Sequence, residues 1–203
     1  KLIAGPEAAD VVDIRLPVAE NIALVAKAKG ISNSDVTVCV LDRPRHQTIV
    51  DEIRAAGARI KFIIDGDVAG GITAARPDTG VDLLIGVGGT PEGIITACAI
   101  KAIGGTIQGR LWPIDDDERQ RAIDAGHDLD RVLHTNDLVN ADDCFFVATG
   151  ITDGELMHGV CYGAGKAYTE SIVMRSRSGT IRKITSEHSL EKLQAYSAID
   201  YEH

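Results

Sequence analysis

The chain has 203 residues, of which 44% are hydrophobic and 25% charged, enough for one domain with a sizeable core. Its formal net charge of -9 argues against non-specific binding to nucleic acid. No apolar run approaches the roughly 18 residues of a membrane-spanning helix, and no signal peptide is apparent. The cysteines have no Cys-x-x-Cys spacing, so we expect buried free thiols in a cytoplasmic protein, not a zinc site or disulfide framework.

Helices and strands alternate in the first half of the chain. Apolar residues recur at helical spacing in four segments, whereas short β-branched runs predict three buried strands. The expected helices are 16–29, 46–56, 68–75 and 91–103, and the expected strands are 36–41, 60–64 and 81–85. Alternation with short turns is typical of parallel βαβ units.

The second half has a different pattern. We expect a strand at 106–112, a helix at 118–125, a strand at 144–149, and a hairpin turn at 176–179 between strands 171–175 and 180–184. The predicted fold is therefore α/β, a layered sandwich with parallel βα units over roughly 31–112. A mixed, partly antiparallel part covers roughly 113–203.

A polar motif follows each of the three strands expected in the first half. The motifs are Asp42-Arg43-Pro44-Arg45-His46, Asp65-Gly66-Asp67 and Gly88-Gly89-Thr90-Pro91-Glu92. Ligands of open parallel sheets bind at the carboxyl ends of the strands. We therefore expect the three motifs to share one crevice.

The first motif places two arginines on a turn stiffened by Pro44. Arginine forks match phosphate groups bidentately, and Arg43 and Arg45 would oppose the dipole of the helix that follows unless an anion binds there. The alternative is two solvated arginines at a helix start. We expect His46 to pack or cap locally, without a functional role.

The second motif brings together Asp65, Gly66 and Asp67. Their carboxylates could accept hydrogen bonds from sugar hydroxyls or bind a metal ion. The alternative is an ordinary strand-to-helix turn with Asp67 as the helix N-cap.

The third motif is a glycine loop at a helix start, with Thr90 as the expected N-cap and Pro91 at the first helical position. Such a loop favours anions. The carboxylate of Glu92 fits an anion site if a divalent metal lies between them, although it could be only a first-turn helix acid. The spacing differs from a Rossmann fingerprint, and the ribose-binding acid expected some 20 residues later is absent.

These motifs carry a resemblance to a known family. Together with Ala-Thr-Gly-Ile-Thr-Asp-Gly at 148–154 and Ser-Gly-Thr-Ile-Arg at 178–182, their order resembles class II fructose-1,6-bisphosphatase of the GlpX type, most of all its actinobacterial members. The resemblance runs from Leu2 to about Tyr201. It implies metal-dependent removal of the 1-phosphate of fructose 1,6-bisphosphate in gluconeogenesis, and a fold similar to the lithium-sensitive sugar phosphatases.

The resemblance also implies residue roles. Glu92 would bind Mg²⁺ or Mn²⁺, and the Gly89 backbone would meet the substrate. The other substrate-binding residues would be Arg43, Pro44, Arg45, Asp65, Gly66 and Asp67. The partner would be a sugar bisphosphate, with neither nucleic acid nor membrane involved, and a homo-oligomer is expected.

One departure from the family pattern matters. The family's Asp-Pro-x-Glu-Gly-Thr motif, which supplies metal ligands and a catalytic threonine, would precede Lys1. The chain thus resembles the C-terminal portion of the enzyme, and the catalytic residue stays unknown. The alternative function is a non-catalytic sugar-phosphate-binding or regulatory module.

Overall fold

The computed structural model describes residues 1–77, 79–195 and 197. A six-stranded sheet with strand order β3-β2-β4-β1-β5-β6 forms its centre. Its strands are β1 (Leu2–Ala4), β2 (Thr37–Leu41), β3 (Arg59–Ile63), β4 (Leu83–Ile85), β5 (Thr106–Gly109) and β6 (Leu133–His134).

Strand direction decides which residues meet at the edge of this sheet. Strand β2 runs parallel to β3 and β4, as the βαβ pattern predicts. Strand β1 lies antiparallel between β4 and β5, with Leu2 opposite Ile85 and Gln108. The first residue of the chain therefore lies at the edge where β4 ends. The sequence analysis did not predict β1, because three residues are too few to show a period.

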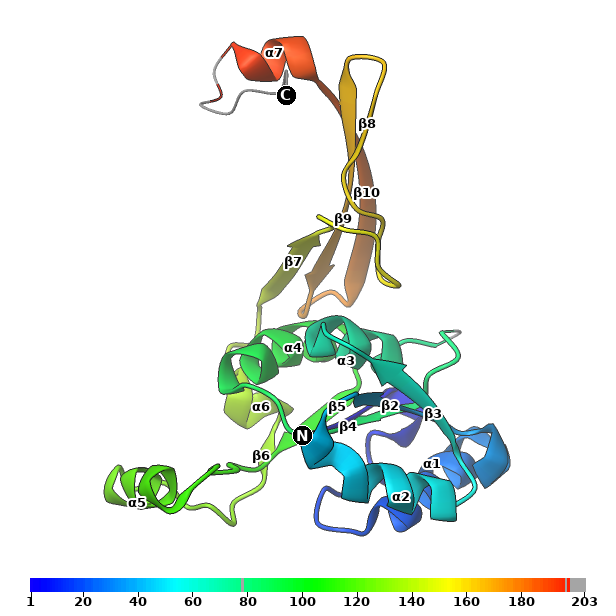
Figure 1. The fold of residues 1–203 in the computed structure, drawn as a ribbon, viewed down its shortest axis with the longest axis vertical. Coiled ribbons are helices and arrows are strands. Elements are labelled where there is room, and N and C mark those ends of the chain that lie inside the picture. Colours follow the sequence, from blue (N-terminus) through cyan, green and yellow to red (C-terminus); the bar gives the residue numbers. More distant parts are fainter. Residues whose placement is uncertain (78, 196, 198–203) are drawn as a thin grey trace.

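Helices cover both faces of the sheet. The helices α1 (Val18–Lys29) and α2 (Gln47–Ala55) lie on one face, and α3 (Asp67–Ala75) and α4 (Thr90–Ile103) on the other (Figure 1). The first pair packs Ile22 and Ile53 against sheet residues such as Val38, and all three side chains are fully buried. This apolar burial stabilises the layer that holds the strand ends in place.

The helices α3 and α4 are sandwiched between two sheets. The second sheet consists of β7 (Phe145–Thr149), β8 (Cys161–Gly163), β9 (Lys166–Arg175) and β10 (Thr180–Ser189), and is antiparallel. A separate core cluster joins Ile72 of α3 and Ala99 of α4 to Ile172 and Met174 of β9. Seven residues of α3 are buried, which agrees with its small and mostly apolar side chains.

Two parts extend away from the helices. The long hairpin of β9 and β10 rises from the body with α7 (Leu190–Gln194) at its far end, and α5 (Asp116–Asp124) projects at the opposite side (Figure 1). The remaining helix, α6 (Thr135–Leu138), packs beside α4. No helix in the part of the chain that the structure describes is both long and apolar enough to cross a membrane.

The predicted α/β fold, with parallel units followed by an antiparallel part, is confirmed. Several boundaries differ. The hairpin strands continue to Lys166 and Ser189, well beyond the apolar residues that predicted them, because hydrogen bonding between two strands does not need a buried face. The strand expected at 106–112 ends at Gly109.

The cysteines are free thiols, as expected, but not all are buried. Cys39 is buried, Cys98 and Cys144 are half-buried, and Cys161 is exposed on β8, so the expected burial is wrong for Cys161. Burial raises the pKa of the Cys39 thiol to about 11. That thiol is therefore protonated and unreactive near neutral pH.

Candidate functional site

The three polar motifs begin where β2, β3 and β4 end. The first forms a 3-10 turn over Pro44–His46 that leads into α2, the second leads into α3, and the third leads into α4. Because these strands are parallel, all three motifs lie at one edge of the sheet. The side-chain contacts described next bring them together.

The first motif holds the glycine loop through the backbone of Val87. The Arg45 guanidinium donates to the Val87 carbonyl from Nη2 at 2.9 Å and from Nε at 3.3 Å. The Val87 N–H donates to Nε2 of His46 at 2.9 Å. Nδ1 of His46 lies 2.8 Å from the Leu41 carbonyl at the end of β2. His46 thus packs locally, as expected, but it also connects two motifs.

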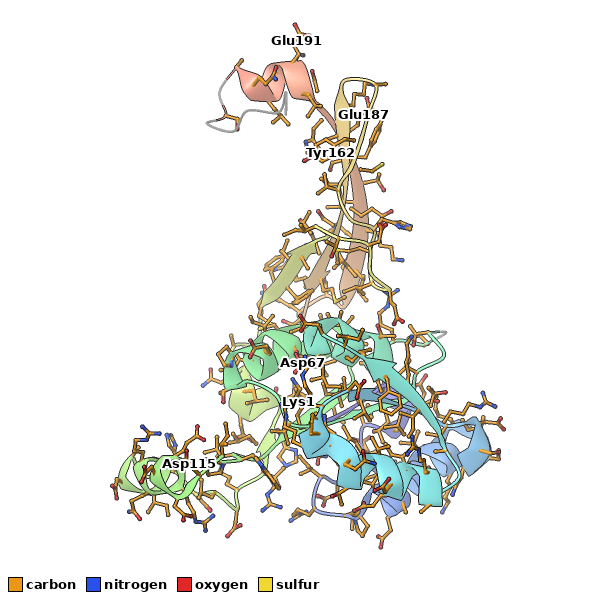
Figure 2. The ribbon with its side chains drawn as sticks, viewed as in Figure 1. Lys1, Asp67, Asp115, Tyr162, Glu187 and Glu191 are labelled. Atoms are coloured by element: carbon orange, nitrogen blue, oxygen red, sulfur yellow. The ribbon has the colours of Figure 1, made fainter. Side chains whose placement is uncertain are left out.

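The second motif meets the glycine loop through Asp67. Its carboxylate forms an ion pair with Lys1, and both residues are labelled in Figure 2. The side chains of Asp67 and Lys1 are only 10% and 8% exposed. A Cβ at Gly88 would overlap Oδ2 of Asp67 and lie 3.1 Å from Nζ of Lys1. Only glycine therefore lets the loop approach the pair without a shift of these groups.

Asp67 does not act as the helix N-cap that the alternative interpretation of this motif expected. The N-cap of α3 is Gly66, in the left-handed conformation at φ 78°, and Asp67 is the first helical residue. Its carboxylate is directed to Lys1 instead, because β1 brings that lysine to the same edge.

Replacement of the two aspartates of this motif should have different effects on stability. Asp67→Ala would leave the buried Lys1 ammonium without a counter-charge, so the free energy of unfolding should fall by about 3 kcal/mol. Asp65 is exposed, and among the described residues its carboxylate accepts from the N–H of Gly66, at 2.8 Å. Asp65→Ala should change stability by no more than about 0.5 kcal/mol. Urea unfolding of both variants checks this, and equal losses would contradict it.

Glu92 lies in the first turn of α4 with its carboxylate turned back to the loop. A Cβ at Gly89 would overlap Oε2 of Glu92, so the absence of a side chain there makes room for the carboxylate. Gly89 is the N-cap and Thr90 the first helical residue, one position earlier than predicted. Pro91 is then at the second position, where its missing N–H still costs no helical hydrogen bond.

The described residues do not by themselves form a metal site. Mg²⁺ takes six oxygen ligands, several of them water, with one or two carboxylates commonly among them. No group of three or more His, Cys, Asp or Glu residues converges in the part of the chain that the structure describes. Asp67 is already paired with Lys1, whereas the carboxylates of Glu92 and Asp65 are exposed and could be offered to an ion.

Arg43 and Asp65 are the less constrained members of the site. Nη1 of Arg43 donates to the Asp42 carbonyl at 2.8 Å, a local contact that leaves its other donors available. Asp65 is exposed. Both residues can therefore reach a ligand at this edge without breaking a contact to another motif.

The sequence analysis missed two residues that organise the site. Lys1 reaches it through an antiparallel strand with no visible period, so no local signal could have identified it. His46 had a local signal, because it lies next to Arg45 and follows a buried strand, but we predicted no functional role for it. Its full burial with polar contacts on both ring nitrogens became visible only in three dimensions.

A cavity of about 660 Å³ lies elsewhere, beyond the other end of α3. Its lining contains none of the motif residues, and its Lys61 is paired with Glu155 at 2.6 Å. The lining residues of the cavity are Lys61, Thr73, Arg76, Pro77, Thr79, Glu155, Leu156 and Lys183.

Comparison with known proteins identifies the family of the chain. The chain is 41% identical over 206 aligned positions to "Fructose-1,6-bisphosphatase class 2" of Haemophilus influenzae, covering 95% of this chain and 62% of that protein. It is 38% identical to "Fructose-1,6-bisphosphatase 1 class 2" of Escherichia coli K12, covering 95% of this chain and 61% of the relative. The chain thus spans about three fifths of the length of these relatives. The family model described as "Bacterial fructose-1,6-bisphosphatase, glpX-encoded" matches residues 1–188, and the chain belongs to that family.

Proposed function

We propose that the full-length protein containing this chain hydrolyses the 1-phosphate of fructose 1,6-bisphosphate, giving fructose 6-phosphate and inorganic phosphate in gluconeogenesis. The observation that carries the proposal is the contact between the three strand-end motifs in a chain of this family. Two arginines, a helix N-terminus behind a glycine loop and an available carboxylate suit a phosphorylated sugar. The particular resemblance of the chain to actinobacterial members of the family stays a prediction.

The substrate would lie across the edge formed by the motifs. Arg43 would bind a phosphate group, and Arg45 would do so with the donors that Val87 does not occupy. Pro44 would line the site, and Asp65, Gly66 and Asp67 would orient the sugar. Because Lys1 holds Asp67, that carboxylate would have a fixed direction.

The glycine loop would complete the edge. The backbone of Gly89 would approach the substrate, since it has no side chain to prevent contact. We expect the reaction to require Mg²⁺ or Mn²⁺, with Glu92 contributing one ligand and other ligands coming from elsewhere in the full-length protein. A divalent ion would supply charge stabilisation and an activated water.

Phosphate release tests the proposal. The full-length protein should release one equivalent of phosphate from fructose 1,6-bisphosphate with Mn²⁺ present, and little from fructose 6-phosphate. Release should stop on chelation of the metal and return when Mn²⁺ is restored. An absence of phosphate release at every metal concentration would refute the activity.

The role of Arg43 gives a kinetic prediction. Arg43→Ala in the full-length protein should raise KM about tenfold or more with a smaller change in kcat, because a ground-state phosphate contact is lost. Arg54→Ala is the matched control, since its side chain is 61% exposed on α2 and lies 3.8 Å from the carboxylate of Asp51. Initial-rate kinetics measure both variants. An unchanged KM in Arg43→Ala would remove the phosphate role.

A second function fits the 203 residues taken alone. The arginines and glycine loop suit a phosphorylated ligand, whereas the described residues include no cluster of three metal-binding side chains. The isolated chain would then be a sugar-phosphate-binding or regulatory module. Calorimetric binding of fructose 1,6-bisphosphate without phosphate release would support this module, and release by the isolated chain would exclude it.

The remaining expectations concern partners and location. We propose a cytoplasmic homo-oligomer with a small-molecule sugar bisphosphate as ligand and with neither nucleic acid nor membrane as partner. The negative net charge of -9 agrees with the absence of a nucleic-acid partner. Sedimentation equilibrium of the full-length protein measures the oligomeric state.

A further inference from the structure

Two side chains of the first motif hold both backbone polar groups of one loop residue, Val87. The Val87 N–H donates to His46 at 2.9 Å, and the Val87 carbonyl accepts from Nη2 of Arg45 at 2.9 Å. The two contacts differ in environment. Arg45 is exposed, whereas His46 is fully buried, so the histidine contact is shielded from competing water.

The partners of His46 determine which ring nitrogen carries the proton. The Leu41 carbonyl can only accept a hydrogen bond, so Nδ1, 2.8 Å away, must donate. The Val87 N–H can only donate, so Nε2 must accept. The ring is therefore neutral with its proton on Nδ1, and it connects the end of β2 to the loop that follows β4.

Besides His46, the loop is held by Arg45 at the Val87 carbonyl and by the Lys1 carbonyl, which accepts from the Gly86 N–H at 3.0 Å. Gly88 and Gly89 have no side chains to pack, and glycines leave the backbone a wide choice of conformations. The imidazole lies directly against the loop, since a Cβ at Gly86 would be 3.3 Å from Cε1 and Nε2. An apolar residue of similar size in place of His46 would remove the hydrogen bonds that His46 makes to the Val87 N–H and the Leu41 carbonyl.

We propose that His46 is a positioning residue for the glycine loop, holding the Val87 amide so that Gly89 and Glu92 face the substrate. This inference rests on the proposed function for its effect on catalysis, but the positioning itself can be measured without catalysis. His46 does not touch the substrate. It acts through the loop backbone.

Two substitutions separate loop positioning from local packing. The amide of His46→Asn is placed like Nδ1, so it can still donate to Leu41 but falls short of Val87. The longer side chain of His46→Gln can present its amide oxygen near the Nε2 position and accept from Val87. Each variant loses one buried hydrogen bond, so both melting temperatures should fall by a similar amount.

The first readout is hydrogen–deuterium exchange of residues 86–93 in the full-length protein. Exchange should be about tenfold faster in His46→Asn and close to wild type in His46→Gln. The second readout is kcat/KM for fructose 1,6-bisphosphate, expected to fall about tenfold or more in His46→Asn and to be largely retained in His46→Gln. Equal effects of the two variants, in proportion to their melting temperatures, would overturn the proposal.

The wild-type protein supplies a test that does not depend on the variants folding. With ¹⁵N-histidine, His46 should show a protonated Nδ1, a bare Nε2 and a scalar coupling from the Val87 N–H across the hydrogen bond. A proton on Nε2 would overturn the proposal. The wild-type protein could lack phosphatase activity and still show this coupling, with faster loop exchange in His46→Asn than in His46→Gln. That result would reject the proposed function but not the positioning role of His46.

Discussion

Glu92→Gln in the full-length protein is expected to lower the turnover of fructose 1,6-bisphosphate by about a hundredfold or more. The substitution keeps the shape of the side chain but removes the charge that would bind a divalent ion, and loss of a metal ligand removes a large part of the transition-state stabilisation. Glu92 is exposed in the first turn of α4. Stability should therefore fall only by the helix-dipole contribution of about 0.3–1 kcal/mol.

A matched control separates the metal role from the dipole effect. Glu20 is also an exposed glutamate in the first turn of a helix, α1, on the other side of the sheet. Glu20→Gln should lose the same small amount of stability while retaining full turnover. Phosphate release and thermal melting of both variants provide the comparison. Wild-type turnover in Glu92→Gln would exclude this residue as a ligand.

A titration with Mn²⁺ distinguishes metal binding by Glu92 from a role in orienting the loop. If Glu92 binds the ion, its replacement should raise the Mn²⁺ concentration needed for half-maximal rate, in addition to lowering the maximal rate. A lower rate with an unchanged Mn²⁺ requirement would instead indicate that the carboxylate orients the loop. The contact between Glu92 and Gly89 makes that second outcome a real alternative.

The parallel part of the fold and the meeting of the motifs were predictable from the sequence, since both depend on local patterns. The strands near 36–41, 60–64 and 81–85 are β-branched or apolar runs, and a polar motif follows each one. The general rule for parallel sheets then places the motifs at one edge. Contacts of Arg45 and His46 with Val87 agree with that expectation.

The contacts that fix the site were not predictable, because they depend on strand order. Lys1 reaches Asp67 only because β1 inserts antiparallel between β4 and β5. Nothing in a three-residue apolar run indicates its neighbours. Whether Asp67 is a free ligand or one half of a buried ion pair depends on this contact with Lys1. The residues next to Asp67 in the sequence therefore do not predict its role.

The structure also changes how the two arginines are interpreted. From the sequence, the same role is predicted for Arg43 and Arg45, namely binding of phosphate. In the structure Arg45 already donates two hydrogen bonds to Val87, whereas among the described residues Arg43 donates to the neighbouring Asp42 carbonyl alone. Arg45 can therefore bind an anion and hold the loop at once, and its replacement would combine both losses. For that reason Arg43 is the cleaner test of phosphate binding.

Gly89→Ala is expected to reduce activity strongly in a protein that remains folded. The φ of Gly89 is -64°, which any residue adopts, so the backbone is not strained by a side chain. The new Cβ would overlap Oε2 of Glu92, which must then swing away. Because this is the far end of a flexible, exposed side chain, the steric cost is small while the carboxylate loses its position. We expect a loss of about tenfold or more in kcat/KM, with a melting temperature close to wild type.

Gly93→Ala, four residues later in α4, is the matched control. A Cβ at Gly93 would meet nothing within 4 Å, and alanine in a helix interior is more stable than glycine by about 0.5–1 kcal/mol. This variant should melt slightly higher and retain its activity. Equal activity of the two variants would mean that the position of Glu92 beside the loop is not needed. A loss confined to Gly89→Ala would instead connect the absence of one side chain to the orientation of the carboxylate.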